Sequence, residues 1–151
     1  MLRKAKLNDA RKIYNLIHFW AQRGACLERS LNYIYEHTRD FTVYEENRKI
    51  VGVCALHLVG WNDLAEIKSL VVDKKYQNKG IGRSLVSVCI KEAKGLGAKS
   101  VFALTFIGPF FKKMGFRKIS KDNLPHKIWS ECVHCVYFPN CQEEAFVLNL
   151  K

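Results

Sequence analysis

A short glycine-containing loop between two regular elements constrains this chain more than any other feature. This glycine loop, residues 77–84, reads Gln-Asn-Lys-Gly-Ile-Gly-Arg-Ser. It follows an apolar, β-branched run at 65–72 that is typical of a buried strand, and it precedes apolar residues at helical spacing that end near Gly95 and Gly97. A turn from a strand into a helix presents the first helical N–H groups and the positive end of the helix dipole, which favour phosphate oxygens. The sequence therefore predicts a phosphate-binding loop.

The alternative is an ordinary strand-to-helix turn that happens to contain two glycines. No Gly-Lys-Ser/Thr follows, so the glycine loop is not the phosphate loop of nucleoside triphosphatases. The third glycine of the dinucleotide fingerprint is missing as well. Because the motif is short, its interpretation depends on the elements that surround it.

The composition is that of one globular domain. The chain has 151 residues and 48% hydrophobic content, which is enough for one compact core and too short for two. We therefore expect a single domain over 1–151. Charged residues crowd the start of the chain, and no apolar run approaches the roughly 18 residues of a membrane span. A soluble, cytoplasmic protein without a membrane partner is expected.

The formal net charge of +11 invites a nucleic-acid hypothesis, because basic surfaces bind phosphate backbones. The lysines and arginines are spread along the chain with no run longer than two, and no RNA-binding signature with clustered aromatics is visible. We therefore expect no nucleic-acid partner. The charge fits a polyanionic cofactor and an acidic small-molecule substrate equally well, and a homodimer is compatible with the sequence.

The six cysteines favour a reducing compartment. Cys54 lies in an apolar strand pattern and Cys89 on an apolar helix face. A reduced thiol at such a position behaves as a small hydrophobe. Free thiols and a cytoplasmic location are therefore expected.

Three further cysteines have a spacing that is typical of metal sites. Cys132, Cys135 and Cys141 form a Cys-x2-Cys-x5-Cys pattern, which His126 or His134 could complete as a tetrahedral zinc site. Reduced packing cysteines and a redox-labile pair are the alternatives. The sequence leaves the metal content open.

Hydrophobic periodicity predicts strands and helices that alternate along the chain. Strands are expected at 2–5, 41–44, 50–58, 65–72, 100–105, 116–119 and 145–148, and helices from Asn8 or Asp9 to Gly24, from Ser30, from Ile81 to Gly95, and from Gly108 to Gly115. A polar turn at 45–49 joins two of the strands into a hairpin. This order mixes hairpins with one helical crossover, which predicts a mixed α/β sheet.

The glycine loop and the element order together resemble the GNAT superfamily of N-acetyltransferases. The acetyl-coenzyme A loop of that superfamily, Gln/Arg-x-x-Gly-x-Gly/Ala, appears here as Gln77–Gly82. The segments 54–57, 63–68, 104–106 and 110–116 resemble, more closely, the acetyltransferase domain of N-acetylglutamate synthases. This resemblance implies a three-layer GNAT fold with a mostly antiparallel central sheet, acetyl-CoA as co-substrate, and acetylation of the α-amine of L-glutamate, the first step of arginine biosynthesis.

Two other functions remain open at this stage. One is the acetylation of proteins, peptides or other small amines on the same fold. The other is a non-catalytic module that binds CoA or RNA. A screen of amino acids and basic peptides with acetyl-CoA would separate these functions.

The resemblance assigns the donor to the end of the strand and to the glycine loop. The expected cofactor-binding residues are Leu70, Val71, Val72, Gln77, Asn78, Lys79, Gly80, Ile81, Gly82, Arg83, Ser84 and Phe111. Many GNAT enzymes carry a tyrosine at the position of Phe111, where it is thought to protonate the departing thiolate. Phenylalanine removes that phenolic acid, so we expect Phe111 to pack in the core or against the cofactor and assign it no proton chemistry.

Glu66 is the expected catalytic base, because the family places a glutamate at this point. The period of two on the strand predicts that Glu66 and Lys68 share a face, with Leu70 and Val72 continuing it. The alternative is a solvated charge pattern of Glu66 and Lys68.

The expected substrate-binding residues are Arg29, Lys68 and Thr105. Arg29 lies in the loop between the first two helices, which borders the acceptor site in GNAT proteins, and its alternative role is that of an exposed charge at the entry of a helix. Direct transfer is expected rather than a cysteinyl intermediate, because no cysteine lies in the strand or loop beside the expected thioester.

Overall fold

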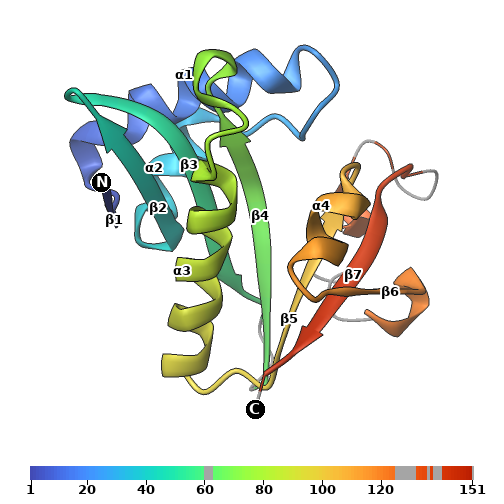
Figure 1. Cartoon of the computed structure of the whole chain (residues 1–151). Coiled ribbons are helices and arrows are strands. Elements are labelled where there is room, and N and C mark those ends of the chain that lie inside the picture. The colour runs from blue at the N-terminus through green and yellow to red at the C-terminus, as the bar shows by residue number, and fades with distance from the viewer. Residues whose placement is uncertain (60–62, 125–131, 136, 138–140, 151) are drawn as a thin grey trace.

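The computed structural model describes the chain except for residues 60–62, 125–131, 136, 138–140 and 151 (Figure 1). The described residues form one sheet of seven strands in the order β1-β2-β3-β4-β5-β7-β6. The strands are β1 (Leu2–Lys4), β2 (Phe41–Glu46), β3 (Lys49–Leu58), β4 (Leu64–Val72), β5 (Ser100–Thr105), β6 (Arg117–Ile119) and β7 (Glu144–Asn149). The helices are α1 (Ala10–Ala21), α2 (Leu31–Glu36), α3 (Ile81–Gly95) and α4 (Gly108–Lys113).

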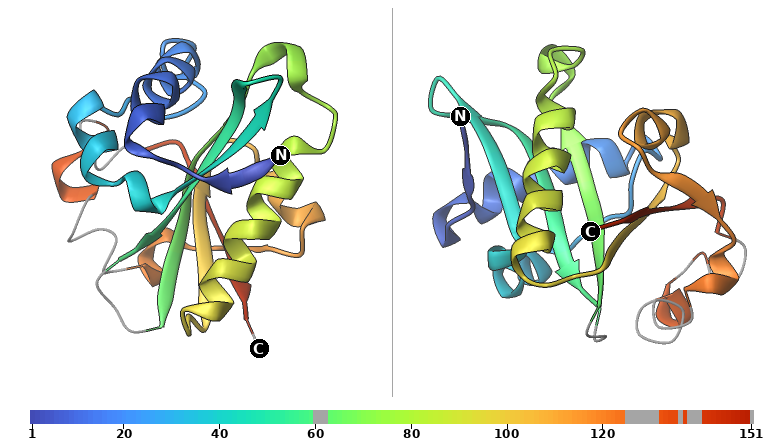
Figure 2. Two further views of the ribbon diagram at one scale, coloured as in Figure 1. Left: turned by 90° about the vertical axis from the view of Figure 1, so that its left-hand side faces the viewer. Right: turned by 60° about the horizontal axis from the view of Figure 1, so that its bottom comes forward.

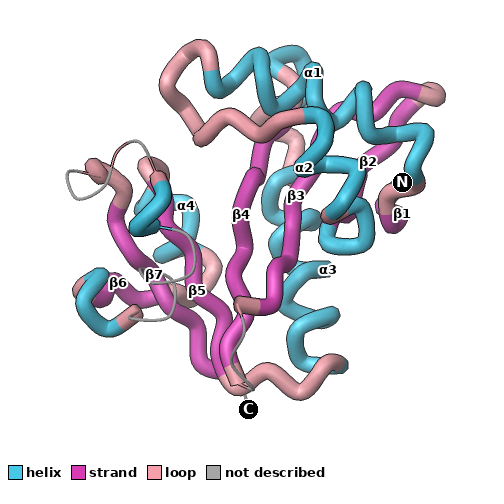
Figure 3. Tube along the Cα trace, turned by 180° about the vertical axis from the view of Figure 1, so that it is seen from behind, coloured by secondary structure: helices cyan, strands magenta, loops and turns pink. Residues whose placement is uncertain are grey.

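Helices cover both faces of the sheet, so the molecule has three layers (Figures 2 and 3). Ile13 of α1 and Ile34 of α2 pack with Val71 on one face. Leu85 of α3 packs with Ile67 on the opposite face, to which α4 also belongs. All strand pairs are antiparallel except β4 and β5, which are parallel. The expected mixed, mostly antiparallel sheet in a three-layer fold is confirmed.

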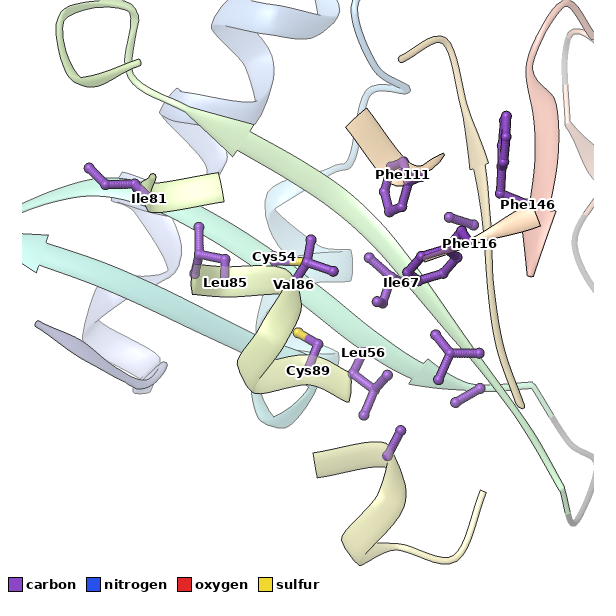
Figure 4. Close-up of a cluster of buried hydrophobic side chains, with 14 of the residues drawn as sticks. Cys54, Leu56, Ile67, Ile81, Leu85, Val86, Cys89, Phe111, Phe116 and Phe146 are labelled. Atoms are coloured by element: carbon purple, nitrogen blue, oxygen red, sulfur yellow. The ribbon is translucent and has the colours of Figure 1, made fainter. Parts of the chain in front are cut away.

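The largest core cluster lies between α3 and the centre of the sheet (Figure 4). A Cβ at Gly52 would lie 2.9 Å from Ile81 Cγ2 and 3.0 Å from Leu85 Cδ1, so glycine at this position allows α3 to approach β3 closely. Cys54 and Cys89 are fully buried in this cluster as free thiols, as expected. A hydrogen bond with Cys89 and burial raise the pKa of the Cys54 thiol, which therefore packs as a neutral group.

The two halves of the sheet separate from each other between β4 and β5. The parallel pairing covers only Leu64–Glu66 of β4 and Ser100–Phe102 of β5. Beyond these residues the two strands diverge, and Figure 1 shows them well apart at the end where α4 lies. Because β5 continues to pair with β7, the divergence leaves an opening in the middle of the fold.

A β-bulge in β4 changes the predicted arrangement of its side chains. Ala55 of β3 pairs with Lys68 but Val53 pairs with Val71, so β4 has one extra residue at this point. Ser69, in this extra step, has φ 56°. Glu66 and Lys68 therefore face α1 and α2, whereas Leu70 and Val72 pack with the α3 cluster on the opposite face. The expectation that Leu70 and Val72 continue the face of Glu66 and Lys68 is wrong. The inserted residue interrupts the alternation of side chains, so the residues after it point to the opposite face.

Most element ends lie within three residues of the predictions, such as the end of α1 at Ala21 rather than Gly24. The hairpin turn is shorter than expected, because β2 extends to Glu46 and β3 begins at Lys49, with Asn47 and Arg48 at φ 52° and 63°. Two residues at positive φ are the usual solution for a tight hairpin. Ser30 is confirmed as the N-cap of α2, since Tyr33 N donates to Ser30 Oγ at 2.9 Å.

Asp9 precedes α1 as expected, but its carboxylate makes no capping bond to the helix. It instead accepts from Arg3 Nη1 at 2.7 Å, from Arg3 Nη2 at 3.0 Å, and from Lys6 N at 2.8 Å. Asp9 is only 4% exposed. This bidentate pair ties β1 to the start of α1, and hydrogen bonds from Arg3 hold the pKa of the Asp9 carboxyl below its ordinary value.

Replacing Asp9 with asparagine is expected to lower the free energy of unfolding by about 2–3 kcal/mol at pH 7, because a buried ion pair loses one partner. A carboxyl whose folded pKa is depressed stabilises the fold above its unfolded pKa of about 3.9 and loses this effect as the pH falls through the folded value. Urea denaturation at pH 7 and pH 3 should therefore show a smaller difference at pH 3. Asp122→Asn, at an exposed position, is the control. An equal loss at both pH values would contradict the ion-pair explanation.

Candidate active site

A cleft of about 1040 Å³ opens where β4 and β5 diverge. Its walls come from the end of β4, the glycine loop, α4, the loop between α1 and α2, and described residues of the segment 132–143. The cleft therefore joins parts of the chain that are distant in sequence. It contains most of the residues that the sequence predicted.

The donor end of the cleft is formed by β4 and the glycine loop. The predicted residues that line it are Leu70, Val71, Val72, Gln77, Asn78, Gly80, Ile81, Gly82 and Arg83. Gly80 has φ 81° and is the N-cap of α3. The first hydrogen bond of the helix runs from Ser84 N to Gly80 O at 3.0 Å, so the backbone N–H groups of 81–83 point out of the helix end. These amides and the dipole of a helix of 15 residues suit a diphosphate.

Because Gly82 has no side chain, a diphosphate can approach the backbone of the glycine loop closely. A Cβ at Gly82 would lie 3.7 Å from the Phe110 ring and 3.8 Å from Val72 Cγ2. A longer side chain would therefore extend into the space between the loop and α4. The residues present fit the phosphate groups of coenzyme A.

Two predicted donor residues, Lys79 and Ser84, are not among the described residues that line the cleft. The Lys79 ammonium lies 5.3 Å from the centroid of the Tyr76 ring, which does line the cleft. A contact of Lys79 or Ser84 with the donor stays a prediction. Trp20 was not predicted, yet it lines the cleft and its Nε1 donates to Val72 O at 3.0 Å, which ties α1 to the end of β4.

The residues predicted for the acceptor, Glu66, Lys68, Arg29 and Thr105, all line the same cleft. Glu66 is 2% exposed and Lys68 is 8% exposed. The alternative of a solvated charge pattern is therefore wrong, because both side chains have been withdrawn from water. Charged groups are seldom buried in this way unless they pair or act in chemistry.

Tyr33 of α2 brings the two predicted substrate-binding cations together. Arg29 Cζ lies 5.2 Å and Lys68 Nζ lies 5.4 Å from the centroid of the Tyr33 ring. Arg29 is half-buried, and its Nε is a buried atom without a hydrogen-bond partner among the described residues. Arg29 is thus not an exposed charge at a helix entry. No sequence pattern identified Tyr33, because its contacts depend on how α2 packs on the sheet.

A histidine on the adjacent strand neighbours Glu66 and pairs with an aspartate. His57 of β3 is the register partner of Glu66 in β4, and its Nδ1 lies 2.9 Å from Asp40 Oδ2. The His57 ring is also 5.7 Å from the ring of His37. No local sequence pattern predicts this neighbour of Glu66, since only the antiparallel register of β3 and β4 places His57 beside it.

Thr105 and Phe111 mark the side of the cleft formed by β5 and α4. Thr105 Oγ1 accepts a hydrogen bond from Ile107 N at 2.9 Å, so the hydroxyl holds the turn into α4 while it lines the cleft. Phe111 is 3% exposed and packs edge-on against Phe116. The packing role expected for Phe111 agrees with this position.

Comparison with known proteins identifies the family. The family model described as "Acetyltransferase (GNAT) family" matches residues 7–116. The chain belongs to the GNAT acetyltransferase family. It is 40% identical over 149 residues to a protein of Chlorobaculum tepidum that is named an uncharacterized N-acetyltransferase. The match covers 99% of this chain and 96% of that relative. The chain is 33% identical over 134 residues to an amino-acid acetyltransferase of Mycobacterium tuberculosis, which covers 87% of this chain and 76% of the relative.

Solved GNAT structures have the same fold. An N-acetylglutamate synthase from Neisseria gonorrhoeae, complexed with coenzyme A and N-acetyl-glutamate, superimposes with a TM-score of 0.91 at 28% identity. The match covers 100% of this chain and 35% of that one, so this chain spans about a third of the synthase. Rv2747 from Mycobacterium tuberculosis, in complex with CoA and NLQ, gives a TM-score of 0.86 at 28% identity and covers 99% of that chain. This GNAT protein is an acetyl-CoA-dependent N-acetyltransferase.

Four cysteines of this GNAT protein line the cleft, although none lies in β4 or the glycine loop. They are Cys26, Cys132, Cys135 and Cys141. Burial raises the pKa of Cys26 to about 11, so its thiol is protonated at neutral pH and is a poor nucleophile.

Among the described residues no group of three His, Cys, Asp or Glu side chains is arranged to hold a metal ion, and the predicted ligand His126 lies outside the described residues.

The helices of this GNAT protein give no sign of a membrane segment. None of those in the described part of the chain has the length and hydropathy needed to cross a bilayer.

Proposed function

We propose that this GNAT acetyltransferase transfers the acetyl group of acetyl-CoA to the α-amine of an acidic amino acid, most of all L-glutamate, and so forms N-acetylglutamate. One observation carries the proposal. Arg29 and Lys68 converge on Tyr33 in the same cleft as the buried carboxylate of Glu66. The amino-acid acetyltransferase of Mycobacterium tuberculosis and the synthase complex with N-acetyl-glutamate support the same substrate class.

The two cations suit the two carboxylates of glutamate. The Arg29 guanidinium offers a planar fork for bidentate binding. Its buried Nε–H has no hydrogen-bond acceptor among the described residues. Lys68 provides a point charge that is largely desolvated, which strengthens its attraction for a carboxylate. With both carboxylates held, the α-amine is directed toward Glu66. A basic peptide would meet the same two positive charges, which disfavours it as the acceptor.

The transfer step follows from the neighbours of the thioester. Glu66 accepts a proton from the substrate ammonium, directly or through water, and the free amine attacks the thioester carbonyl carbon. The bulge at Ser69 and Leu70 interrupts the β-ladder inside the cleft, which frees backbone groups to polarise the carbonyl oxygen. The C–S bond then breaks, the attacking nitrogen loses its second proton to water, and CoA leaves as a thiolate that takes up a proton from water. Glu66 releases its proton to solvent, so one proton is released in each turnover. A thiol with a pKa near 8.5 needs no tyrosine acid to depart, in keeping with Phe111.

We propose direct transfer in a ternary complex. A cysteinyl intermediate would need a thiolate beside the thioester, whereas burial keeps Cys26 protonated. All six cysteines are free thiols, which also supports a place in the reducing cytoplasm.

Replacing Arg29 with alanine is expected to raise the KM for glutamate about tenfold and to leave the KM for acetyl-CoA unchanged. A charge-assisted hydrogen bond to one substrate carboxylate is lost, and the half-buried position makes its contribution moderate. Steady-state kinetics with each substrate varied in turn measures the effect. The control is Arg117→Ala on the exposed surface of β6. Equal changes in the two KM values would argue against an acceptor contact.

A mass-spectrometric screen tests the proposed function as a whole. The purified chain is incubated with acetyl-CoA and each proteinogenic amino acid, and in parallel with a set of basic peptides. Acetylation of glutamate at the highest kcat/KM is the expected result. Preferential acetylation of peptides, or binding of acetyl-CoA without any turnover, would overturn the proposal.

A further inference from the structure

A second hollow lies outside the cleft, between α1, the β2–β3 turn and the segment that leads from β4 to the glycine loop. Its volume is about 710 Å³. Six basic side chains line it: Lys12, Arg23, Arg48, Lys49, Lys74 and Lys75. We call these residues the basic hollow. None of the six lines the active-site cleft, so the two sites have separate walls.

The fold gathers charges that are dispersed along the sequence. Lys12 belongs to α1, Lys49 to the start of β3, and Lys75 to a short helical turn at Lys74–Tyr76. All three segments lie at the same end of the sheet (Figure 1). Runs of no more than two basic residues thus combine into one cationic surface.

Few negative charges balance this surface. Asp73 is the one carboxylate among the described residues that line the hollow, against the six cations. Its Oδ1 accepts from Lys75 N at 2.9 Å, and its Oδ2 lies 3.7 Å from Lys49 Nζ. Like charges collected in a concave surface repel one another and raise the local potential, which a bound polyanion relieves.

The shape of the hollow favours a compact anion. Its volume falls in the range of small-molecule sites. Lysine attracts phosphate as a point charge, so the hollow can bind phosphate groups in more than one orientation. A nucleic-acid strand would require exposed aromatic faces for stacking. The only aromatic side chain of the described lining is Phe19, and the guanidinium of Arg23 covers its ring at 3.6 Å from the centroid.

We propose that the basic hollow binds a small anion with two or more linked phosphate groups, at the same time as acetyl-CoA occupies the cleft. Tyr76 separates the two sites, since its ring lines the cleft while Lys49 of the hollow approaches it to 6.0 Å. This binding does not depend on which amine the enzyme acetylates.

Calorimetric titration of the CoA-saturated full-length chain tests the proposal, because saturation blocks the diphosphate site of the glycine loop. Tripolyphosphate is expected to bind with one equivalent and more tightly than pyrophosphate. The double variant Lys12→Glu, Lys75→Glu should weaken tripolyphosphate binding about tenfold or more, since two attractive charges become repulsive. Lys12→Ala alone should weaken it about threefold, which provides a milder variant if the double variant does not fold.

The matched control is Lys91→Glu, Lys94→Glu, at exposed positions of α3, because it lowers the net charge by the same amount. It should change the affinity less than about twofold. If both double variants weakened tripolyphosphate binding equally, the effect would come from net charge alone, and the proposed site would be wrong. The absence of binding to the CoA-saturated chain would overturn it too, as would a single-stranded oligonucleotide that displaces tripolyphosphate at lower concentration.

Discussion

Replacing Glu66 with glutamine is expected to lower kcat for the proposed acetylation of glutamate by about 100-fold or more, the usual contribution of a positioned general base. Glutamine keeps the size and hydrogen-bonding reach of the side chain but cannot accept a proton. Because Glu66 is only 2% exposed, water does not readily replace it as the base. The KM for both substrates should change little, since the lost interaction belongs to the transition state.

The pH dependence separates a base from a structural carboxylate. The effect of Glu66→Gln should be largest near neutral pH, where the substrate amine is mostly protonated, and should shrink as the pH rises and free amine becomes abundant. A pH-independent loss would argue against a base. Glu28→Gln is the matched control, because Glu28 also lines the cleft but is exposed and pairs with His18 at 2.7 Å. Its kcat should stay within about twofold of the unaltered enzyme.

Replacing Gly80 with valine raises the KM for acetyl-CoA by up to about 100-fold. No atom lies within 4 Å of a Cβ built at Gly80, so the effect is not a steric clash. It arises because φ of 81° costs a β-branched residue about 1–3 kcal/mol, which the loop escapes by moving the amides of 81–83 away from the diphosphate.

Gly97→Val controls for backbone strain alone. Gly97 has φ 89° and follows the far end of α3, away from the glycine loop. Both variants should lose thermal stability by a similar amount, but only Gly80→Val should raise the KM for acetyl-CoA. Kinetics with acetyl-CoA varied at saturating glutamate, together with thermal denaturation of both variants, makes the comparison. A similar rise in KM for Gly97→Val would mean that strain acts through global stability.

Local patterns predicted the elements well, and most of the residues proposed for the donor site line the cleft. The β-branched run at 65–72, the two glycines and the apolar stripe beyond Ile81 are contiguous, so their geometry follows from strand, turn and helix physics. The acceptor side could not be predicted in the same way. Tyr33 reaches Lys68 only through the packing of α2 on the sheet, and His57 meets Glu66 only through the β3–β4 register. Such contacts depend on tertiary arrangement, which periodicity does not encode.

The sequence did not reveal the basic hollow for the same reason. Basic residues that are scattered in sequence form one hollow because α1, a hairpin turn and the segment after β4 meet in space. The cysteines of 132–141 likewise reach the cleft from a segment whose placement no local pattern determines. The cysteine spacing was visible in the sequence, whereas the position of these cysteines in the wall of the cleft was not.

The inserted residue in β4 lets one strand serve two independent tasks. Before the bulge, Glu66 and Lys68 face the layer of α1 and α2, and after it Leu70 and Val72 pack with the layer of α3. In the proposed function, the acceptor residues Glu66 and Lys68 therefore lie on one face, whereas the donor residues Leu70 and Val72 lie on the other and Val71 stays on the first. Substitutions at positions 66 and 68 can retune the acceptor while the acetyl-CoA site keeps its packing. Under the proposed function, we therefore expect acceptor specificity to be exchangeable, by evolution or by engineering, with little change to Leu70 and Val72 on the donor side.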